Sequence, residues 1–423
     1  MEAICITFGL MLLLFVLTVP IGASITLATF VGLYLSDMPL SMAIQRYFSL
    51  FDSFPLMAIP FFVLSGDLMQ RGSMADDLFN MCRAWVGHWT GGLAMISILI
   101  CLFYAALCGS ALATTAAVGS MVIPAMLKEG YGRNFSAACC TVGGTLGPMI
   151  PPSIPLILMG SFGNLSVPDL FLATIIPGCL VAGSFMLAGQ YVVRKNNYGI
   201  VRPKPSLKER LQATAKAKYA LGVPAIILGG IYGGIATPTE AGAFAVLYAL
   251  FIECLVTRNL NKKELIAALY SSLNTLGVIM IVMLAANALG ILVQFHNVTG
   301  MLTQLVHSMN ITSGLGLFAL LSLVLLILGC FMEGTALIII LTPILVPLAI
   351  NFNINPIHFC IYFLVFINIG LYTPPVGTNL YVGARVADTS LGGVSKAIVP
   401  FLLANLIAAL LIIFIPSLSL CLL

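Results

Sequence analysis

The chain has 423 residues, and its 18 Lys or Arg and 14 Asp or Glu make up only 8% of them, against roughly 25% in a soluble globular domain. Hydrophobic residues account for 60% of the sequence and the mean hydropathy is +1.10, so lipid must be the solvent for most of the chain. These values exclude soluble enzymes, nucleic-acid binders and disordered scaffolds. Long continuous apolar runs also argue against a membrane β-barrel, and we predict an all-α polytopic membrane protein.

The apolar runs of the first half predict five membrane spans, since a crossing needs roughly 20 residues. The first run lacks the basic flank of a signal peptide, so we expect a retained membrane helix. The polar stretch 36–52 predicts a short interfacial helix. The predicted spans lie at residues 4–18, 20–35, 55–70, 135–162 and 170–192.

The segment 194–218 is strongly basic and divides the chain near its midpoint. It holds 8 of the 18 basic residues and two prolines, Pro203 and Pro205. The positive-inside rule places such a segment in the cytoplasm. We therefore predict a cytoplasmic linker between two halves, residues 1–193 and 219–423.

The second half again predicts five spans, at 219–235, 238–257, 275–293, 357–384 and 398–420, with an interfacial helix at 258–272. Two apolar stretches, 93–127 and 315–350, remain; each is too long for one crossing and too short for two. Small polar residues interrupt both near the middle, at 108–115 and 333–336. A re-entrant hairpin with a buried tip explains each stretch.

Short strings recur in the same order in the two halves. PIGA at 20–23, GSAL at 109–112 and GPMIPP at 147–152 correspond to PTEA at 238–241, GTAL at 334–337 and GLYTPP at 370–375. The loop 128–133 is charged whereas its counterpart 351–355 is not, so equivalent loops are expected on opposite sides of the membrane, with both termini extracytoplasmic. We predict two inverted-topology repeats, each of about five spans plus one hairpin, an arrangement typical of secondary transporters.

The hairpin tips and the two broken spans, 135–162 and 357–384, are expected to meet near the midplane. Double prolines free carbonyl oxygens, which with hydroxyls can ligate an alkali cation, and half-helix N-termini attract an anion. Packing glycines and simple kinks are the alternative for any single residue; the repetition in both halves favours a site. The candidate cation-binding residues are Gly109, Ser110, Thr114, Gly144, Thr145, Glu333, Gly334, Thr335, Thr373 and Pro374, and the candidate substrate-binding residues are Ser110, Pro151, Pro152, Ser153, Thr335, Pro375, Thr378 and Asn379.

Glu333 is the only charged residue in the 120 positions from 265 to 384. An ionisable residue inside a membrane segment indicates function: Glu333 can coordinate a cation, relay a proton, or cap the following helix. Glu240 is expected to begin a helix, and Asp67 to be solvated at the cytoplasmic end of its span.

Other chemistry finds no support in the sequence. The 11 cysteines form no CxxC pair and the four histidines are dispersed, so no metal centre other than an alkali-cation site is expected. A phosphate-binding GxxxxGKS or GxxxxGKT motif is missing, which points to an ion gradient rather than ATP as the energy source. No catalytic set or cofactor motif is recognisable, and we predict a transporter, not an enzyme.

Four strings resemble the large membrane subunit of tripartite ATP-independent periplasmic (TRAP) transporters: GGTLGPMIPPSIP at 143–155, GIATPTEAG at 234–242, EGTALIIILTPILVP at 333–347 and NIGLYTPPVGTNL at 368–380. The resemblance covers essentially the whole chain. Two departures concern the tips: Glu333 stands where an Asp is usual, and Cys108-Gly109-Ser110-Ala111 replaces a more Ser-rich sequence.

The resemblance implies a sodium-coupled importer of small organic acids, of dicarboxylate or sugar-acid type, in the inner membrane. It also implies an extracytoplasmic substrate-binding protein, a small four-helix membrane subunit, and an elevator mechanism in which a hairpin-bearing transport region moves against a scaffold. Sodium sites would lie at the two tips, with the substrate between them. A stand-alone ion-coupled organic-anion carrier or exchanger of related fold is the alternative.

Overall fold

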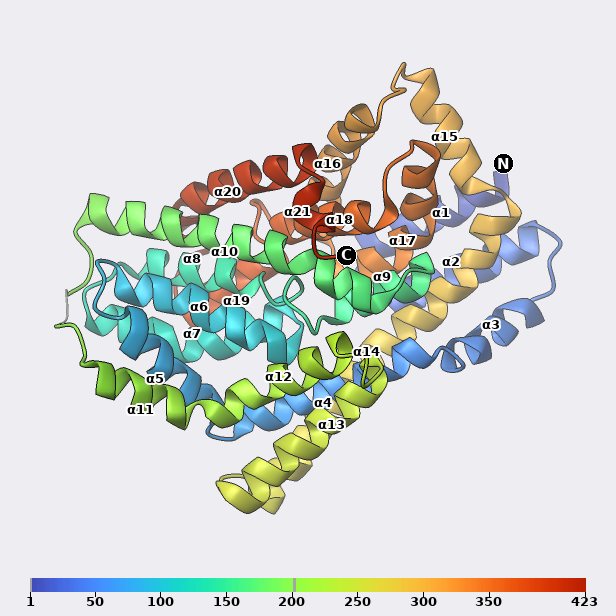
Figure 1. Cartoon of the computed structure of the whole chain (residues 1–423). Helices are drawn as coiled ribbons and strands as arrows, with labels where there is room; N and C mark the ends of the chain where they lie inside the picture. The colour runs from blue at the N-terminus through green and yellow to red at the C-terminus, as the bar shows by residue number, and fades with distance from the viewer. Residues whose placement is uncertain (1, 201–202) are drawn as a thin grey trace.

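The computed structural model describes residues 2–200 and 203–423, without the side chains of residue 51 and residues 106–108, and it consists of helices with no strand in those ranges (Figure 1). By length and composition, seven of these helices can cross a membrane, or eight if the bent pair 41–50 and 54–71 forms one span. The prediction of an all-α polytopic membrane protein is confirmed. Residue 1 and residues 201–202 of the predicted linker lie outside the described residues.

The helices of the first half follow the predicted runs, except that residues 74–86 form a helix where none was predicted. Both predicted interruptions are present, one of two residues after α6 and a longer one after α8. The elements are α1 (Glu2–Val16), α2 (Ile21–Leu35), α3 (Ser41–Phe51), the 3-10 turn η1 (Phe54–Met57), α4 (Ala58–Arg71), α5 (Met74–Val86), α6 (Gly92–Cys108), α7 (Ala111–Lys128), α8 (Arg133–Gly144), α9 (Ile154–Gly163) and α10 (Val167–Asn196).

The second half also has two breaks, after α16 and after α18. Its elements are α11 (Leu207–Lys216), α12 (Lys218–Tyr232), α13 (Pro238–Leu250), the π-helix η2 (Phe251–Val256), α14 (Lys262–Phe295), α15 (Val298–Ser308), α16 (Gly314–Phe331), α17 (Gly334–Asn351), α18 (Pro356–Gly370), α19 (Thr378–Val386), α20 (Leu391–Phe414) and α21 (Ser417–Leu420).

The predicted boundary between residues 258–272 and the following span is wrong. Residues 258–272 do not form a separate interfacial helix, because α14 runs without a break for 34 residues from Lys262. Its first turns, KKELIAALYSS, contain neither Gly nor Pro and consist largely of good helix formers. Asn261 caps this helix by accepting a hydrogen bond from the Glu264 amide, at 2.9 Å. Helix propensity therefore extends α14 beyond the predicted span, 275–293.

The basic linker is also more ordered than a simple connection. It contains α11, which packs against α5 and begins with a capping box in which Ser206 and Glu209 bond reciprocally. The amide and hydroxyl of Ser206 donate to the Glu209 carboxylate and hold its pKa below the usual value. A reciprocal cap of this kind satisfies two otherwise unpaired N–H groups at a helix start.

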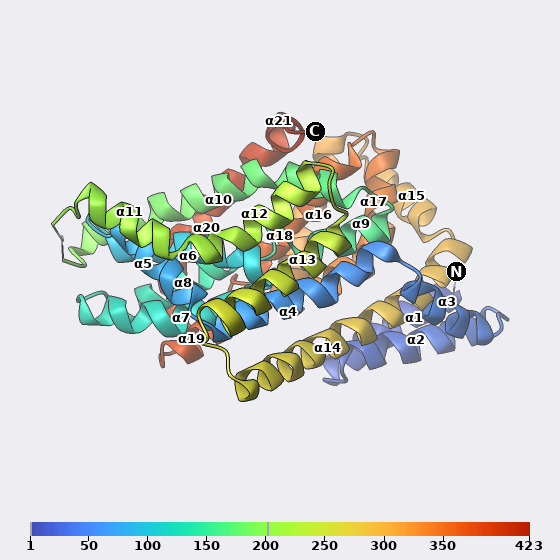
Figure 2. The ribbon, with the colours of Figure 1, turned by 60° about the horizontal axis from the view of Figure 1, so that its bottom comes forward.

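The helices divide into two packing groups. In the first, α6 to α9 and α16 to α19 contact one another; in the second, α1 to α4 pack with α13 and α14, and α12 packs on α13. Figure 2 shows α1, α2, α3 and α14 together along one side of the molecule. All four interrupted segments therefore belong to the first group.

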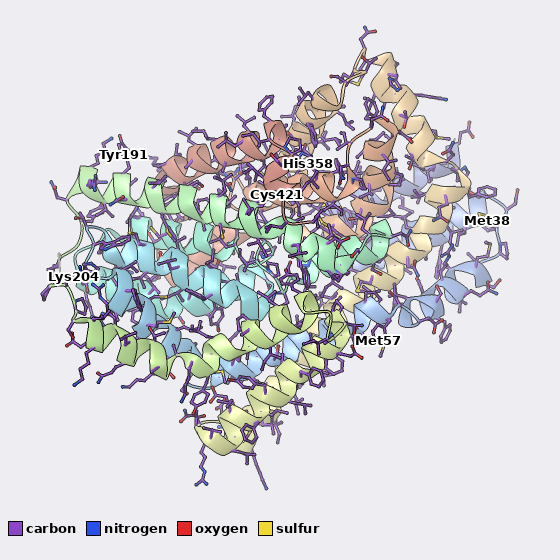
Figure 3. The ribbon with its side chains drawn as sticks, viewed as in Figure 1. Met38, Met57, Tyr191, Lys204, His358 and Cys421 are labelled. Atoms are coloured by element: carbon purple, nitrogen blue, oxygen red, sulfur yellow. The ribbon has the colours of Figure 1, made fainter. Side chains whose placement is uncertain are left out.

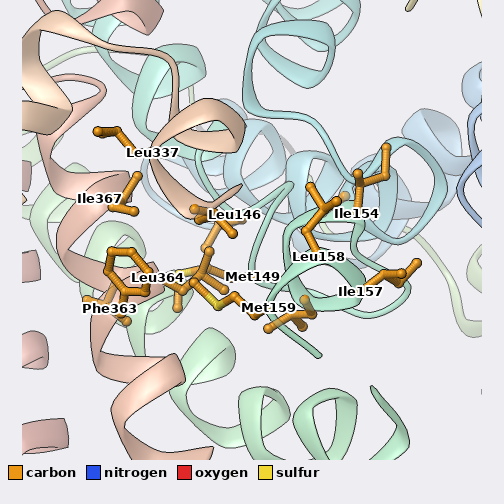
Figure 4. Close-up of a cluster of buried hydrophobic side chains, with 14 of the residues drawn as sticks. Leu146, Met149, Ile154, Ile157, Leu158, Met159, Leu337, Phe363, Leu364 and Ile367 are labelled. Atoms are coloured by element: carbon orange, nitrogen blue, oxygen red, sulfur yellow. The ribbon is translucent and has the colours of Figure 1, made fainter. Parts of the chain in front are cut away.

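The breaks are buried within apolar packing. Figure 4 shows Leu146 and Met149, from the break after α8, among the side chains of Leu337 from α17 and Phe363 from α18; all four residues are buried. Where α16 crosses α18, Gly370 lies against Gly329, and a Cβ at position 370 would lie 2.6 Å from the Gly329 Cα. Interior side chains are packed as tightly as organic crystals, so this crossing cannot absorb a methyl group without a shift.

Replacing Gly370 by Ala is therefore expected to destabilise the fold by about 1–3 kcal/mol, the usual cost of overpacking. The measurement is the thermal unfolding midpoint of the purified chain in detergent. Gly277→Ala is the matched control, because nothing lies within 4 Å of a Cβ at that position of α14. Equal midpoints for the two variants would contradict a close crossing at Gly370.

Candidate functional site

A cavity of about 690 Å³ lies between the two packing groups. The tip residues 109–113 and 333–339 close one side, and the other side is formed by α4, α14 and the start of α2. The structure thus brings the two predicted tips into one cavity. Its polar lining residues are Ser110, Glu333 and Thr335 from the tips, Asp67 and Gln70 from α4, and Thr275 from α14.

The first tip turns within two residues. Gly109 has φ of +60°, a left-handed conformation that residues with a Cβ rarely adopt. Ser110 is extended and caps α7, its hydroxyl lying 3.5 Å from the Ala113 amide. A Cβ on Gly109 would lie 3.0 Å from the Ile154 amide nitrogen, so this tip rests against the start of α9.

Behind the first tip, hydroxyl groups of α7 face the end of α8. Thr114 is fully buried and its hydroxyl has no hydrogen-bond partner in the described protein. Gly144 lies against the Thr115 side chain, whereas the Thr145 hydroxyl donates to the Val142 carbonyl at 2.7 Å. Of the hydroxyls predicted to bind a cation here, Thr114 alone is both buried and without a partner in the described protein. Buried polar groups are normally hydrogen-bonded, so this hydroxyl is free to bind a ligand.

The second tip is organised by Glu333. Its carboxylate caps α17, accepting hydrogen bonds from the Ala336 amide at 3.1 Å and from the Thr335 hydroxyl at 2.8 Å. The capping alternative for Glu333 is therefore confirmed. The same residue also lines the cavity, and its neighbour Gly334 packs against Ile367 of α18.

The break after α18 is tied to the end of α16. The Gly377 amide donates to the Cys330 carbonyl at 2.9 Å, and the Cys330 thiol lies 3.5 Å from the Thr373 carbonyl oxygen. The Thr373 hydroxyl donates to the Ile369 carbonyl at the end of α18, at 2.6 Å. Pro374-Pro375 in this break and Pro151-Pro152 in the other are both cis.

Several predicted substrate residues lie away from the cavity. The residues Pro151, Pro152, Ser153, Pro375, Thr378 and Asn379 are not among those that line it. Ser153 is buried and donates to the Pro148 carbonyl, and Asn379 is buried and donates to the Thr141 carbonyl at 2.7 Å. Asn379 thereby joins α19 of the second half to α8 of the first.

Two polar residues near the tips were not predicted. Asp67 was expected to be solvated; instead it lines the cavity and accepts a 2.7 Å hydrogen bond from Ser272 of α14. Asn368 is buried next to both tips, and its amide nitrogen has no hydrogen-bond partner in the described protein. The signal for Asn368 was a polar side chain in the apolar second half of α18, which is costly in a membrane.

The electrostatics of the cavity come from helix ends and carboxylates. Both α7 and α17 begin at it, so two partially positive N-termini face the same space. No Lys or Arg is among the described residues that line it, whereas Asp67 and Glu333 are. No group of three or more His, Cys, Asp or Glu within the described ranges can hold a metal ion, so cation binding would rest on hydroxyl, carbonyl and carboxylate oxygens.

Comparison with known proteins identifies the family. The family model of the DctM component of tripartite ATP-independent periplasmic transporters matches residues 8–418. The isethionate TRAP transporter permease protein DctMQ of Oleidesulfovibrio alaskensis is 37% identical over 98% of this chain, which spans 66% of that relative. The C4-dicarboxylate large permease protein DctM of Rhodobacter capsulatus is 33% identical over 99% of this chain and 98% of its own length. The sialic acid large permease protein SiaM of Vibrio cholerae is 34% identical over 98% and 96%.

Among solved structures, the YdaH transporter of Alcanivorax borkumensis superposes with a TM-score of 0.60, covering 91% of this chain and 89% of that one. At 15% sequence identity this likeness concerns the fold alone. The family match covers nearly the whole chain, and the relatives are transport permeases and not enzymes. The chain therefore belongs to the large membrane subunits, the DctM components, of the tripartite ATP-independent periplasmic transporters.

Proposed function

We propose that the chain is the permease of a sodium-coupled uptake system for small organic acids, of dicarboxylate or sugar-acid type, that a substrate-binding protein delivers from outside the membrane. The names of the relatives support this substrate class: they include C4-dicarboxylates, sialic acid and 2,3-diketo-L-gulonate. The observation that carries the proposal is the cavity that both tips enter. Its size suits a small molecule, since ligand pockets typically measure about 300–1,000 Å³.

Anion recognition in this cavity would rest on backbone and hydroxyl groups. The N-termini of α7 and α17 each supply roughly half a positive charge, and Ser110 adds a hydroxyl donor at the start of α7. This is the pattern by which broken helices in transporters bind anionic groups. Asn368, next to both tips, would add an amide donor.

The charges of the cavity favour coupling to a cation. Asp67 and Glu333 would repel an organic anion, and no Lys or Arg among the described lining residues offsets them. A bound cation would remove this repulsion, which is strong where water is scarce. For sodium we propose the oxygen-rich region behind the first tip, which includes Thr114, and the region of Glu333 at the second.

The two packing groups suit an elevator mechanism. We assign the group of α1 to α4 and α12 to α14 to the scaffold and the group with the hairpins to the transport region, with the substrate cavity on the boundary. The protein would lie in the inner membrane with the basic linker in the cytoplasm and both termini outside. A small four-helix membrane subunit would brace the scaffold.

Uptake of a radiolabelled dicarboxylate or sugar acid into proteoliposomes is expected to require an inward sodium gradient and a cognate binding protein. The measurement compares uptake with sodium or potassium outside, with and without that protein. Full uptake by the chain alone would identify a stand-alone carrier or exchanger. Downhill flux without counterflow would instead indicate a channel.

Glu333→Gln is expected to raise the sodium concentration for half-maximal uptake about tenfold. The reason is that one contact between the ion and a charged oxygen contributes about 1.5 kcal/mol. Glu240→Gln is the matched control: Glu240 also caps a helix with its carboxylate, accepting bonds from Thr237 at 2.8 Å, but it does not line the cavity. An unchanged sodium dependence in the Glu333 variant would exclude a coupling role.

Ser110→Ala is expected to raise the half-saturating concentration of the delivered substrate about tenfold, through loss of one hydrogen bond to a charged group. Ser395→Ala serves as the control, since its hydroxyl donates to Leu391 within α20, at 2.9 Å. Initial uptake rates over a range of substrate concentrations provide the comparison. Equal half-saturating substrate concentrations in the two variants would show that the substrate does not contact the Ser110 hydroxyl.

A further inference from the structure

A second pocket lies far from the tips, at the end of α10 that leads into the basic linker. It measures about 460 Å³ and lies between the C-terminal turns of α10 and the starts of α8 and α20. Three basic side chains line it, one from each helix: Arg133, Lys195 and Lys396. No Asp or Glu is among its described lining residues, so the pocket is cationic.

The two lysines carry charge that the protein does not offset. Arg133 donates to the Ala387 and Asp388 carbonyls, at 3.1 and 3.3 Å, and lies 3.8 Å from the Asp388 carboxylate. Lys195 and Lys396 are exposed and form no ion pair in the described chain. Arg133 therefore holds the loop before α20 in place, whereas both lysines remain available to an anion.

The backbone and the aromatic floor of the pocket also suit a phosphate. α8 begins at Arg133 without a side-chain cap on its first N–H groups, and such helix starts bind phosphates. Asn197 ends α10 in a left-handed conformation and the chain folds back, with the Tyr198 amide bonded to the Val193 carbonyl at 3.1 Å. This turn brings the Tyr198 ring to 5.6 Å from that of Phe135.

Apolar stripes lead from this pocket along the outside of the molecule. On α10, Leu187 and Tyr191 are 69% and 62% exposed and precede Lys195 at intervals of four residues, so the three share one helix face. On α20, Val399 and Leu403 are 46% and 57% exposed beyond Lys396. Tyr191 lies at the outer edge of the molecule, at the same end as Lys204 of the linker (Figure 3).

We propose that this pocket binds the phosphate headgroup of an anionic membrane phospholipid. Lys195, Lys396 and the start of α8 would hold the phosphate, and the acyl chains would follow the exposed stripes of α10 and α20. Exposed tyrosines are typical of the membrane boundary, and basic pockets between helices on the cytoplasmic side bind acidic headgroups. A free phosphate compound would use the basic groups but leave the stripes unused.

The test measures binding of a fluorescent short-chain phosphatidylglycerol to the full-length chain in detergent, together with any membrane subunit that co-purifies. Lys195→Gln with Lys396→Gln is expected to weaken binding roughly 30-fold, since each cation near an anionic lipid surface contributes about fivefold. The matched control is Lys208→Gln with Lys216→Gln, which removes two exposed charges from α11 instead. Thermal unfolding midpoints verify that both double variants are folded.

Competition identifies the ligand. Unlabelled phosphatidylglycerol is expected to displace the probe, whereas phosphatidylcholine, inorganic phosphate and glycerol 3-phosphate at the same concentration are not. Displacement by the soluble phosphates would overturn the lipid assignment in favour of a free anion. Equal weakening by the two double variants would also overturn the proposal, because the attraction would then belong to the basic segment as a whole.

Discussion

In a bilayer, each backbone N–H and C=O group must find its partner inside the protein. A helix break at membrane depth is therefore stable only where it is buried in protein or lines a cavity. The segments that are interrupted after α6, α8, α16 and α18 obey that constraint by packing together in one group. The Gly377 amide, for example, bonds to the last turn of α16. Packing the breaks together also brings the two tips into one cavity.

The same clustering explains the chemistry of the site. Because the two tips meet, the N-termini of α7 and α17 share a cavity with Glu333 and Asp67. Positive helix ends and negative carboxylates thus line the same cavity, where charges interact more strongly than in bulk water. A site of this composition suits an anion and a cation together better than either alone.

Several features could be predicted because they depend on local sequence. Apolar runs and the positions of Gly and Pro located the membrane spans and the four breaks, but not α5, α11 and α15, which are less apolar. Ser110, Glu333 and Thr335 could be assigned to the cavity because the tips were recognisable. Asn368, Asp67 and the substrate candidates in the breaks after α8 and α18 could not be placed, since their surroundings come from helices distant in sequence. α14 was misjudged because its helix propensity extends beyond its apolar segment.

The sequence by itself determined that most of this chain lies in lipid, which segments are helical spans and where they are interrupted, and to which family the chain is related. Hydropathy, helix breakers and motif strings are properties of neighbouring residues. The tertiary structure decided which polar groups meet. It brings the Ser272 hydroxyl to the Asp67 carboxylate and the Asn379 amide to the Thr141 carbonyl of α8. It also brings Arg133, Lys195 and Lys396 together in one pocket. Such encounters depend on how helices cross, which is set by packing between segments far apart along the chain.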